Sequence, residues 1–432
     1  MRVLVLGGDG RAHALVWALD NSASVDDVVA APGNPGIAAM GKRCVPVDAN
    51  DPAAVVRTAG ETAPDLVVVS AEEPLVHGVA DALRTHGTLV FGPGADGARL
   101  EGSKAWMKAV LAEAGVPTAR HAAFTADQQD DALAFLERLP GFYVVKTDGL
   151  AGGKGVTVTE SIDDARDAVR AYLSGQAFGD AGRTCVIEEG LTGPELSLLV
   201  VCNGSTDGWP LAPAQDFKRI GDGDRGPNTG GMGAYSPVPV AGPDVVGEVM
   251  ERAVGPTLHA LAARDISYHG VLYAGLMLTP DGVKVLEYNV RFGDPEAQAV
   301  LPRLASDFGR LCHDAAAGRA DLEPKFREDA CVTVVLASEG YPGTPRTGEF
   351  IEGIDAAEQL TGVTVFHAGT KQADARVMTA GGRVLNVTAV APTLAEARGR
   401  AYEAAGRISW PGMQYRRDIA AAAVESAGKE PA

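Results

Sequence analysis

The sequence is poor in cysteine, and no two of its cysteines are close enough to suggest a metal site. The 432 residues contain five, which lie far apart: Cys44, Cys185, Cys202, Cys312 and Cys331. No pair has the CxxC spacing of a zinc site, and scattered thiols in a chain of this length do not indicate a disulfide framework. Such thiols are typical of a reducing compartment, so we expect a cytoplasmic protein.

Long apolar runs, a signal segment and an excess of positive charge are also missing. No apolar run approaches the length of a membrane span, and Met1-Arg2 leads directly into an apolar strand. The formal net charge is −18, which argues against a general nucleic-acid binder because such proteins need a basic surface. We therefore expect neither a membrane nor a nucleic acid as partner. A local cluster of Lys and Arg can still hold a small anion.

The N-terminal third alternates short apolar strands with helices, which predicts a parallel α/β unit. The predicted strands are Val3–Leu6, Asp27–Ala31, Leu66–Ser70 and Thr88–Phe91, and a helix is expected near Leu75–Arg84. Loops at the C-terminal ends of such strands commonly bind ligands.

The turn Gly7–Gly10 separates the first predicted strand from a helix over about Arg11 to Leu19. A strand, a glycine turn and a helix in this order present backbone N–H groups to an anion. Dinucleotide-binding enzymes begin in the same way, but no convincing acidic residue for a nucleotide ribose follows here. A dehydrogenase is therefore the less favoured interpretation.

The stretch Gly270–Gln298 contains two apolar runs on either side of Pro280-Asp281-Gly282, which predicts a β-hairpin. Alternation along the second strand places Leu286 and Tyr288 on a core face, and it places three polar residues on the other face. These are Glu287, Asn289 and Arg291. Carboxylate and amide oxygens suit Mg²⁺, and a guanidinium suits phosphate. The alternative is an ordinary solvated face of a hairpin.

A second predicted hairpin runs from Phe142 to Thr159 and has a glycine-rich loop, Thr147–Gly155, at its centre. The loop lacks the GxxxxGK[ST] spacing of a Walker P-loop, and a strand follows it instead of a helix. Its backbone N–H groups and the ammonium groups of Lys146 and Lys154 can nevertheless contact a triphosphate. We therefore expect a nucleotide beneath this loop.

Two further stretches carry polar residues in suggestive positions. The strand Cys185–Leu191 ends in an acidic pair, from which Glu188 could accept a hydrogen bond from an adenine amine, and Glu195 follows within reach of a ribose. Surface charge is the alternative for these glutamates. In the glycine-rich segment 214–233, Asp216 could bind an ammonium, and Lys218 with Arg225 could bind a phosphate. The alternative for that segment is a disordered linker.

Taken together, these motifs resemble the ATP-grasp carboxylate–amine ligases, and among them the phosphoribosylamine–glycine ligase family. Four segments carry the resemblance: Leu100–Lys104 (LEGSK), Lys146–Gly155, Gly226–Pro237 (GPNTGGMGAYSP) and Arg291–Gln298 (RFGDPEAQ). The last is the most specific. The chain departs from the family at the first glycine turn, where GGDGRAHA replaces the usual GNGGREHA, and at Phe217, where His is common.

The resemblance implies an α/β protein of ATP-grasp architecture with three domains. We expect a parallel α/β domain over residues 1–102, an ATP-grasp domain over 103–325 with a lid at about 120–192, and a small mixed β domain over 326–432. The last domain shows no constellation of catalytic residue types. The turn Ser338–Gly343 could approach the active site, but an ordinary turn is the favoured interpretation.

The resemblance also implies roles for the residues of this sequence that match the family motifs. The implied metal ligands are Glu287 and Asn289, and the implied catalytic residues are Arg291, Asp216 and Lys154. Implied nucleotide contacts are Lys104, Lys146, Gly152, Gly153, Lys154, Gly155, Glu188, Glu189, Leu191 and Glu195. Implied substrate contacts are Gly8, Gly10, Asp216, Lys218, Asn228, Gly230, Arg291, Gly293 and Asp294.

The activity that the resemblance implies is the joining of glycine to 5-phospho-β-D-ribosylamine with ATP, through glycyl phosphate. The implied cofactors are ATP with Mg²⁺ or Mn²⁺, the partners are these small substrates, and the protein is expected to be a monomer. Two alternatives stay open: another ATP-grasp ligase of purine metabolism, and a nucleotide-binding module without turnover.

Overall fold

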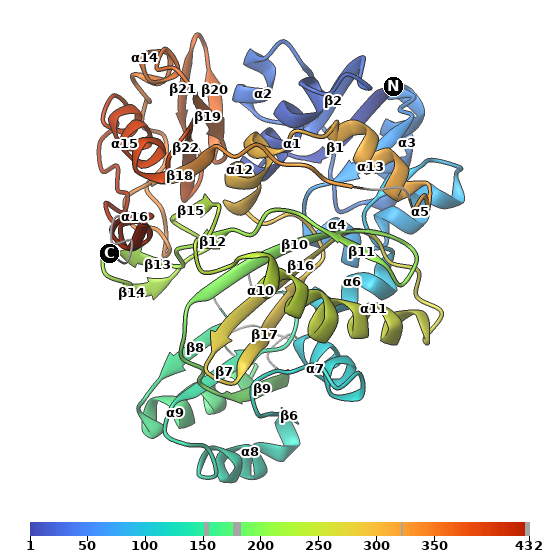
Figure 1. Cartoon of the computed structure of the whole chain (residues 1–432), viewed down its shortest axis with the longest axis vertical. Coiled ribbons are helices and arrows are strands. Elements are labelled where there is room, and N and C mark those ends of the chain that lie inside the picture. The colour runs from blue at the N-terminus through green and yellow to red at the C-terminus, as the bar shows by residue number, and fades with distance from the viewer. Residues whose placement is uncertain (151–154, 176–182, 321–322, 428–432) are drawn as a thin grey trace.

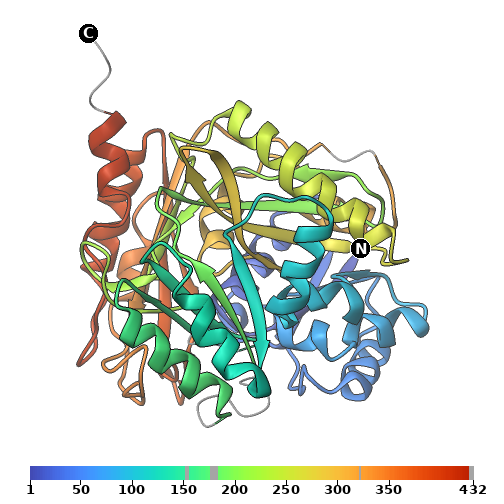
Figure 2. The same cartoon turned by 90° about the horizontal axis from the view of Figure 1, so that it is seen from below.

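The computed structural model describes residues 1–150, 155–175, 183–320 and 323–427. Figure 1 shows the N-terminal α/β part and the C-terminal β part side by side at the top, with the central sheet below them and a smaller sheet, drawn in blue-green, at the bottom. The view from below in Figure 2 places this small sheet and its helices across the central sheet.

The N-terminal part is a parallel five-stranded sheet of order β3-β2-β1-β4-β5. Its elements are β1 Arg2–Gly7, α1 Gly10–Asp20, β2 Asp27–Pro32, α2 Pro35–Ala39, β3 Arg43–Cys44, α3 Pro52–Thr62, β4 Leu66–Val69, α4 Glu72–Val76, α5 Val79–Thr85, β5 Val90–Phe91 and α6 Ala95–Gly102. The predicted parallel unit is confirmed. The expected helix over 75–84 is instead two helices, because Gly78 has φ +79° between them.

A second, antiparallel sheet of order β6-β9-β7-β8 spans the expected lid. Its elements are β6 His121–Thr125, η1 Ala126–Gln128, α8 Gln129–Leu136, β7 Tyr143–Thr147, β8 Val156–Thr159, α9 Ile162–Leu173 and β9 Thr184–Glu189. The helices α8 and α9 bury their apolar side chains against it, and these residues form a core separate from the rest of the protein. This sheet therefore has the packing of a distinct unit.

The central sheet has the order β11-β10-β16-β17 and is antiparallel. Its strands and the elements around them are α7 Lys104–Glu113, β10 Glu195–Asn203, β11 Gly208–Pro210, α10 Pro243–Val249, η3 Met250–Val254, α11 Gly255–Ala262, β16 His269–Thr279, β17 Gly282–Asn289, α12 Glu296–Val300, η4 Leu301–Arg303 and α13 Phe308–Ala316. The predicted hairpin is β16–β17, with Gly282 at φ +103° in its turn.

The expected core position of Leu286 is wrong. Gly275 pairs with Glu287 and Leu276 pairs with Val285, so Leu286 is the extra residue of a β-bulge. Val283, Val285 and Tyr288 remain in the core. The extra residue shifts the alternation by one position, so Leu286 lies on the same side as Glu287 and lines a cavity.

The C-terminal part shares a sheet with the central part. The antiparallel order is β12-β15-β18-β22-β19, in which β12 Gln215–Asp216 and β15 Gly233–Ser236 precede residue 325. The remaining elements are β13 Arg219–Gly221, β14 Arg225–Asn228, β18 Ala330–Ala337, α14 Ile354–Glu358, β19 Val363–His367, β20 Thr370–Ala373, β21 Arg376–Thr379, β22 Arg383–Ala391, α15 Leu394–Ala405 and α16 Ala421–Ala427. The three-domain division stays a prediction.

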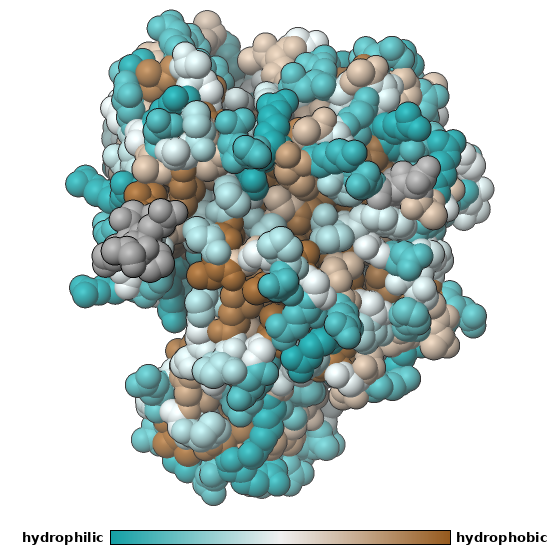
Figure 3. All heavy atoms as spheres, viewed as in Figure 1, coloured by the Kyte–Doolittle hydropathy of each residue, from teal (hydrophilic) through white to brown (hydrophobic). Residues whose placement is uncertain are grey.

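The surface in Figure 3 is mostly hydrophilic, and its apolar side chains gather in the middle band above the small lower sheet. No helix in the described ranges is both long and apolar enough to cross a membrane.

One close approach joins the N-terminal and central parts, and it depends on glycine. Gly270 of β16 has φ +111°, and a Cβ there would lie 2.8 Å from Cα of Gly92. We predict that Gly270→Ala lowers the free energy of unfolding by about 2 kcal/mol or more. Gly60→Ala in α3 is the control: its Cβ meets nothing within 4 Å, and it should raise stability by up to about 1 kcal/mol. Equal urea midpoints for the two variants would contradict this account.

Candidate functional site

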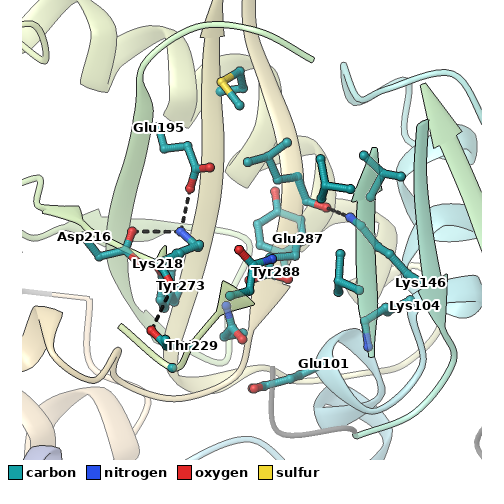
Figure 4. A pocket seen from close by; sticks show the side chains of 18 of the residues that line it. Glu101, Lys104, Lys146, Glu195, Asp216, Lys218, Thr229, Tyr273, Glu287 and Tyr288 are labelled. Atoms are coloured by element: carbon teal, nitrogen blue, oxygen red, sulfur yellow. Dashed lines mark hydrogen bonds and ion pairs between the residues drawn. The ribbon is translucent and has the colours of Figure 1, made fainter. Parts of the chain in front are cut away.

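A cavity of about 720 Å³ lies between the small sheet and the central sheet. Figure 4 shows its side chains: Lys146 and Lys104 come from one side, Glu287 lies in the middle, and Glu195, Asp216 and Lys218 come from the other. A volume of this size is that of an ordinary small-molecule site.

The predicted row of polar residues along β17 faces this cavity. Glu287, Asn289 and Arg291 all line it, and the guanidinium of Arg291 donates to Oδ1 of Asn289 at 3.2 Å. Asn289 is 8% exposed, so the row is not a solvated face. The strand therefore aims a carboxylate, an amide and a guanidinium at one space.

Glu287 is surrounded by cations. Burial alone would raise the pKa of its carboxyl, but the charges of Lys146, Lys218, Lys104 and Arg291 hold that pKa below its ordinary value. Its carboxylate makes no hydrogen bond or ion pair with the described residues, so both oxygens are available. A charged carboxylate beside an amide oxygen fits a hard divalent cation. The described residues contain no group of three or more His, Cys, Asp and Glu that could hold a metal, so any such ion would need oxygens from other sources.

The two described lysines expected at the nucleotide, Lys104 and Lys146, come together, and both have protein partners. Nζ of Lys104, at the start of α7, donates to the carbonyl of Gly149 at 2.9 Å. Nζ of Lys146 donates to the carbonyl of Leu286 at 3.2 Å and lies 2.8 Å from Oε1 of Glu188. Both lysines line the cavity, and Lys146 joins the small sheet to β17.

Glu188 has a different environment from the one we expected. Its other oxygen accepts from Nζ of Lys108 at 2.8 Å, and the carboxylate is almost fully buried. Oε1 lies 2.8 Å from Nζ of Lys146 but accepts no hydrogen bond among the described residues, so the expected role of accepting from an adenine amine stays a prediction. Burial lowers the pKa of Lys108 to about 8, although Glu188 raises it. Lys108 is a member of this group that the sequence analysis missed, because nothing distinguishes it from other lysines on a helix.

The rest of the expected nucleotide contacts divide into two groups. Gly155, Glu189, Leu191 and Glu195 line the cavity. Gly152, Gly153 and Lys154 lie outside the described residues. The carboxylate of Glu189 also accepts from the backbone N–H of Arg120 at 3.0 Å.

On the opposite side, a group of carboxylates surrounds Lys218, whose side chain is partly exposed. Its Nζ donates to Asp216 at 2.8 Å and to Glu195 at 2.6 Å. Glu296 lies nearby and accepts from the hydroxyl of Tyr273 at 2.5 Å. Burial raises the pKa of Asp216 to about 7. The charges of Glu296 and Glu195 also raise this pKa, and the charge of Lys218 offsets these effects only in part. Carboxylates thus outnumber ammonium groups here, which suits a ligand that brings a positive charge.

The segment 226–232 contributes Asn228 and Gly230 to the cavity, as expected. The C-terminal part contributes a residue that the sequence analysis did not single out. Arg383 of β22 lines the cavity and contacts Asp294 at 3.1 Å. The hydroxyl of Tyr341 accepts from the N–H of Gly230 at 2.9 Å, so the turn Ser338–Gly343 does reach this segment.

The glycines of the first turn do not line the cavity, but the side chain of Arg11, which follows the turn, does. Neither Gly8 nor Gly10 is among the described residues that line the cavity, and Gly293 is not either. Asp9 caps α1 by accepting from the N–H of Ala12 at 2.9 Å, and a Cβ at Gly10 would meet Asn386 and Gln298. The turn is therefore packed against protein.

The side chain that reaches the cavity is Arg11. Its guanidinium pairs with Asp9 at 2.7 Å and with Glu72 at 3.2 Å. Glu72 also pairs with Arg291 at 3.1 Å, and Arg291 pairs with Glu101 at 2.8 Å. Burial raises the pKa of Glu101 to about 7 in spite of Arg291. Glu72 could have been found from the sequence, because it follows a predicted parallel strand, where ligand-binding loops lie. No feature of the sequence marks Arg11 as a site residue.

Comparisons with known proteins agree with this arrangement. Three family models of phosphoribosylglycinamide synthetase match the chain: the N domain over residues 1–101, the ATP-grasp (A) domain over 102–297 and the C domain over 331–422. A curated phosphoribosylamine–glycine ligase of Streptomyces coelicolor is 51% identical over 427 residues, which cover 98% of this chain and 99% of the relative. One of Vibrio cholerae is 47% identical over 422 residues, or 97% of each chain.

Solved structures show the same likeness. The crystal structure of phosphoribosylamine–glycine ligase from Thermotoga maritima has a TM-score of 0.83 and 33% identity, and the match covers 97% of this chain and 100% of that one. A biotin carboxylase from Campylobacter jejuni has a TM-score of 0.74 at 13% identity, covering 98% of this chain and 95% of that one. At that identity the second likeness concerns the fold alone.

The buried group around Glu188 yields a prediction about stability. Lys108→Met should lower the free energy of unfolding by roughly 2–4 kcal/mol, because one buried carboxylate oxygen loses its ammonium. Adding Glu188→Gln should recover part of the loss, since the unpaired charge is then gone. The control is Lys371→Met on the exposed strand β20, which should change stability by less than about 0.5 kcal/mol. Additive effects of the two substitutions in urea unfolding would argue against the coupling.

Proposed function

The chain belongs to the phosphoribosylamine–glycine ligase family, and we propose that the cavity between β7 and β17 is where it joins glycine to 5-phospho-β-D-ribosylamine with ATP. The protein is an ATP-dependent carbon–nitrogen ligase of purine biosynthesis. This placement rests on one observation: Glu287, Asn289 and Arg291 line the same cavity as Lys146 of the opposite sheet.

The nucleotide is proposed to lie between the two sheets. Lys104 and Lys146 would contact its phosphates, and Gly155, Glu189, Leu191 and Glu195 would surround the rest of the molecule, with Gly152, Gly153 and Lys154 as further predicted contacts. The side chain of Glu188 would hold Lys146 in place, and its Oε1, which accepts no hydrogen bond among the described residues, would be the acceptor for an adenine amine. Two sheets that enclose a triphosphate also keep water from a reactive intermediate.

Glu287 and Asn289 fit a divalent cation, and we propose Mg²⁺ or Mn²⁺ there. Such an ion would neutralise charge on the phosphate oxygens during transfer. The described protein oxygens at this point are few, which fits an ion that keeps water and phosphate ligands. Arg291 is proposed to stabilise the transferring phosphoryl group, since Glu72 and Glu101 fix its guanidinium beside Asn289.

The reaction has two steps. A carboxylate oxygen of glycine attacks the γ-phosphorus of ATP, and ADP leaves. The sugar amine then attacks the acyl carbon of glycyl phosphate, and phosphate leaves as the nitrogen loses a proton. No protein nucleophile is needed, so the protein contributes position and charge.

The acidic group around Lys218 is the proposed place for the ammonium of glycine, with Asp216 as its main contact. Lys218, Asn228, Gly230 and Asp294 would complete the substrate side. Gly8, Gly10 and Gly293 would act through packing, because they lie outside the cavity lining. A monomeric state and a cytoplasmic location belong to the proposal as well; all five cysteines are free thiols, which suits a reducing compartment.

ADP release with each substrate omitted in turn tests the function itself. Release that requires both glycine and the sugar amine supports it, whereas release with another carboxylate and amine would favour a different ATP-grasp ligase. Binding of ATP without any turnover would favour a nucleotide-binding module.

The metal assignment predicts the effect of one substitution. Glu287→Gln should lower kcat by about 100-fold or more and raise the Mg²⁺ concentration needed for half-maximal rate, because a neutral amide binds a divalent cation weakly. Lys284→Gln on the same strand, outside the cavity lining, is the matched control and should leave both unchanged. Unaltered Mg²⁺ dependence in the Glu287 variant would overturn the assignment.

The raised pKa of Asp216 predicts a pH profile. Below about pH 7 the carboxyl takes up a proton and loses its attraction for the glycine ammonium, so kcat/KM for glycine should fall as the pH falls. Asp216→Asn should lower kcat/KM at high pH and abolish this acid limb. A wild-type profile that stays flat from pH 6 to 8, at saturating ATP and sugar amine, would contradict the role of Asp216.

A further inference from the structure

The C-terminal part holds the substrate-facing segment 217–231 from two directions. At the far end of the segment, the guanidinium of Arg416 donates to the carbonyl of Arg219 at 3.1 Å and pairs with Asp224 at 2.6 Å. It lies 4.8 Å from the ring centre of Phe217 and is almost fully buried. These contacts attach the start and the turn of the hairpin β13–β14 to the C-terminal part.

At the near end, Arg383 makes a denser set of contacts. Its Nη1 donates to the carbonyls of Gly230 and Asp294 at 2.5 Å each, and its Nη2 pairs with the carboxylate of Asp294 at 3.1 Å. One guanidinium thus binds two segments that are far apart in sequence. Both segments carry residues that the proposed function places beside the substrates.

Three local features accompany the contacts of Arg383: a β-bulge, a glycine and a tyrosine hydroxyl. A β-bulge leaves Val384 without a partner on β18, because Ala337 pairs with Arg383 and Leu336 pairs with Leu385. A Cβ at Gly230 would lie 3.0 Å from the guanidinium carbon of Arg383, so a larger residue there would require the guanidinium to shift by a few tenths of an ångström. The hydroxyl of Tyr341 completes the attachment by accepting from the N–H of Gly230.

We propose that Arg383 is a positioning residue that locks the segment 229–231 to Asp294, so that the C-terminal part closes the substrate side of the ligase cavity. This inference rests on the proposed function. Among the described residues, the guanidinium of Arg383 donates to three carbonyl oxygens and one carboxylate, so it acts through the backbone that it holds. A guanidinium suits this task because its planar donors can bind several oxygens at once.

The consequence concerns water. Glycyl phosphate survives only if the cavity excludes water until the amine attacks. If the segment 229–231 loses its attachment, water should reach the intermediate and hydrolyse it to glycine and phosphate. ATP would then be consumed without a matching amount of product.

The test measures ADP and ligated product in the same reaction. For Arg383→Met, we expect the ratio of ADP to product to rise above one and kcat/KM for the sugar amine to fall by about 10- to 100-fold. KM for ATP should change by less than about twofold, because the contacts of Arg383 lie away from the nucleotide side. Arg383→Lys should be intermediate, since an ammonium can replace some of the contacts.

Two controls make the outcome decisive. Arg407→Met, just after α15, removes a partly exposed arginine of the same C-terminal part, whose side chain donates to the carbonyl of Ala356 and the carboxylate of Glu403, and it should behave as wild type. Asp294→Asn combined with Arg383→Met should show less than additive effects. A wild type without product would refute the proposed function and not this inference.

Three results would overturn the inference itself. The first is an ADP-to-product ratio of one in Arg383→Met, with a raised KM for the sugar amine alone, which would mean that Arg383 binds the substrate directly. The second is a parallel rise in KM for ATP, glycine and sugar amine together with a lowered melting temperature, which would mean a general loss of structure. The third is wild-type kinetics.

Discussion

The carboxylate of Glu287 lies among the ammonium groups of Lys104, Lys146 and Lys218, and the rest of the site depends on this arrangement. A buried carboxylate is stable as an anion only where positive charges offset its loss of hydration. The three lysines come from a helix, from the small sheet and from the segment after β12, so charge balance brings three separate parts of the chain to one strand. Apolar packing alone would not place three ammonium groups around one carboxylate.

The same principle extends outward from β17. Arg291 is held by Glu72 and Glu101, and Glu72 also holds Arg11 of the first helix. The altered glycine turn is part of this chain of ion pairs because Asp9 binds Arg11. The turn is thus linked to the guanidinium of Arg291 through charges, and its described glycines do not line the cavity.

Much of this could be predicted from the sequence, and the failures have physical causes. Strands, the hairpin and the row Glu287–Arg291 follow from local alternation and turn chemistry. The bulge at Leu286 could not be predicted, because it depends on pairing with β16. The partners of Glu188 and the reach of Arg383 arise from contacts between distant segments, and no local pattern marks them.

The strands β15 and β18 are hydrogen-bonded to each other, although the domain boundary predicted from the sequence, between residues 325 and 326, lies between them. A chimaera made by exchanging residues 326–432 with those of a relative would therefore separate paired strands of different origin. Recombination between family members should succeed more often when residues 215–236 travel with the C-terminal segment. In evolution the two stretches should accordingly change together, as one inherited block.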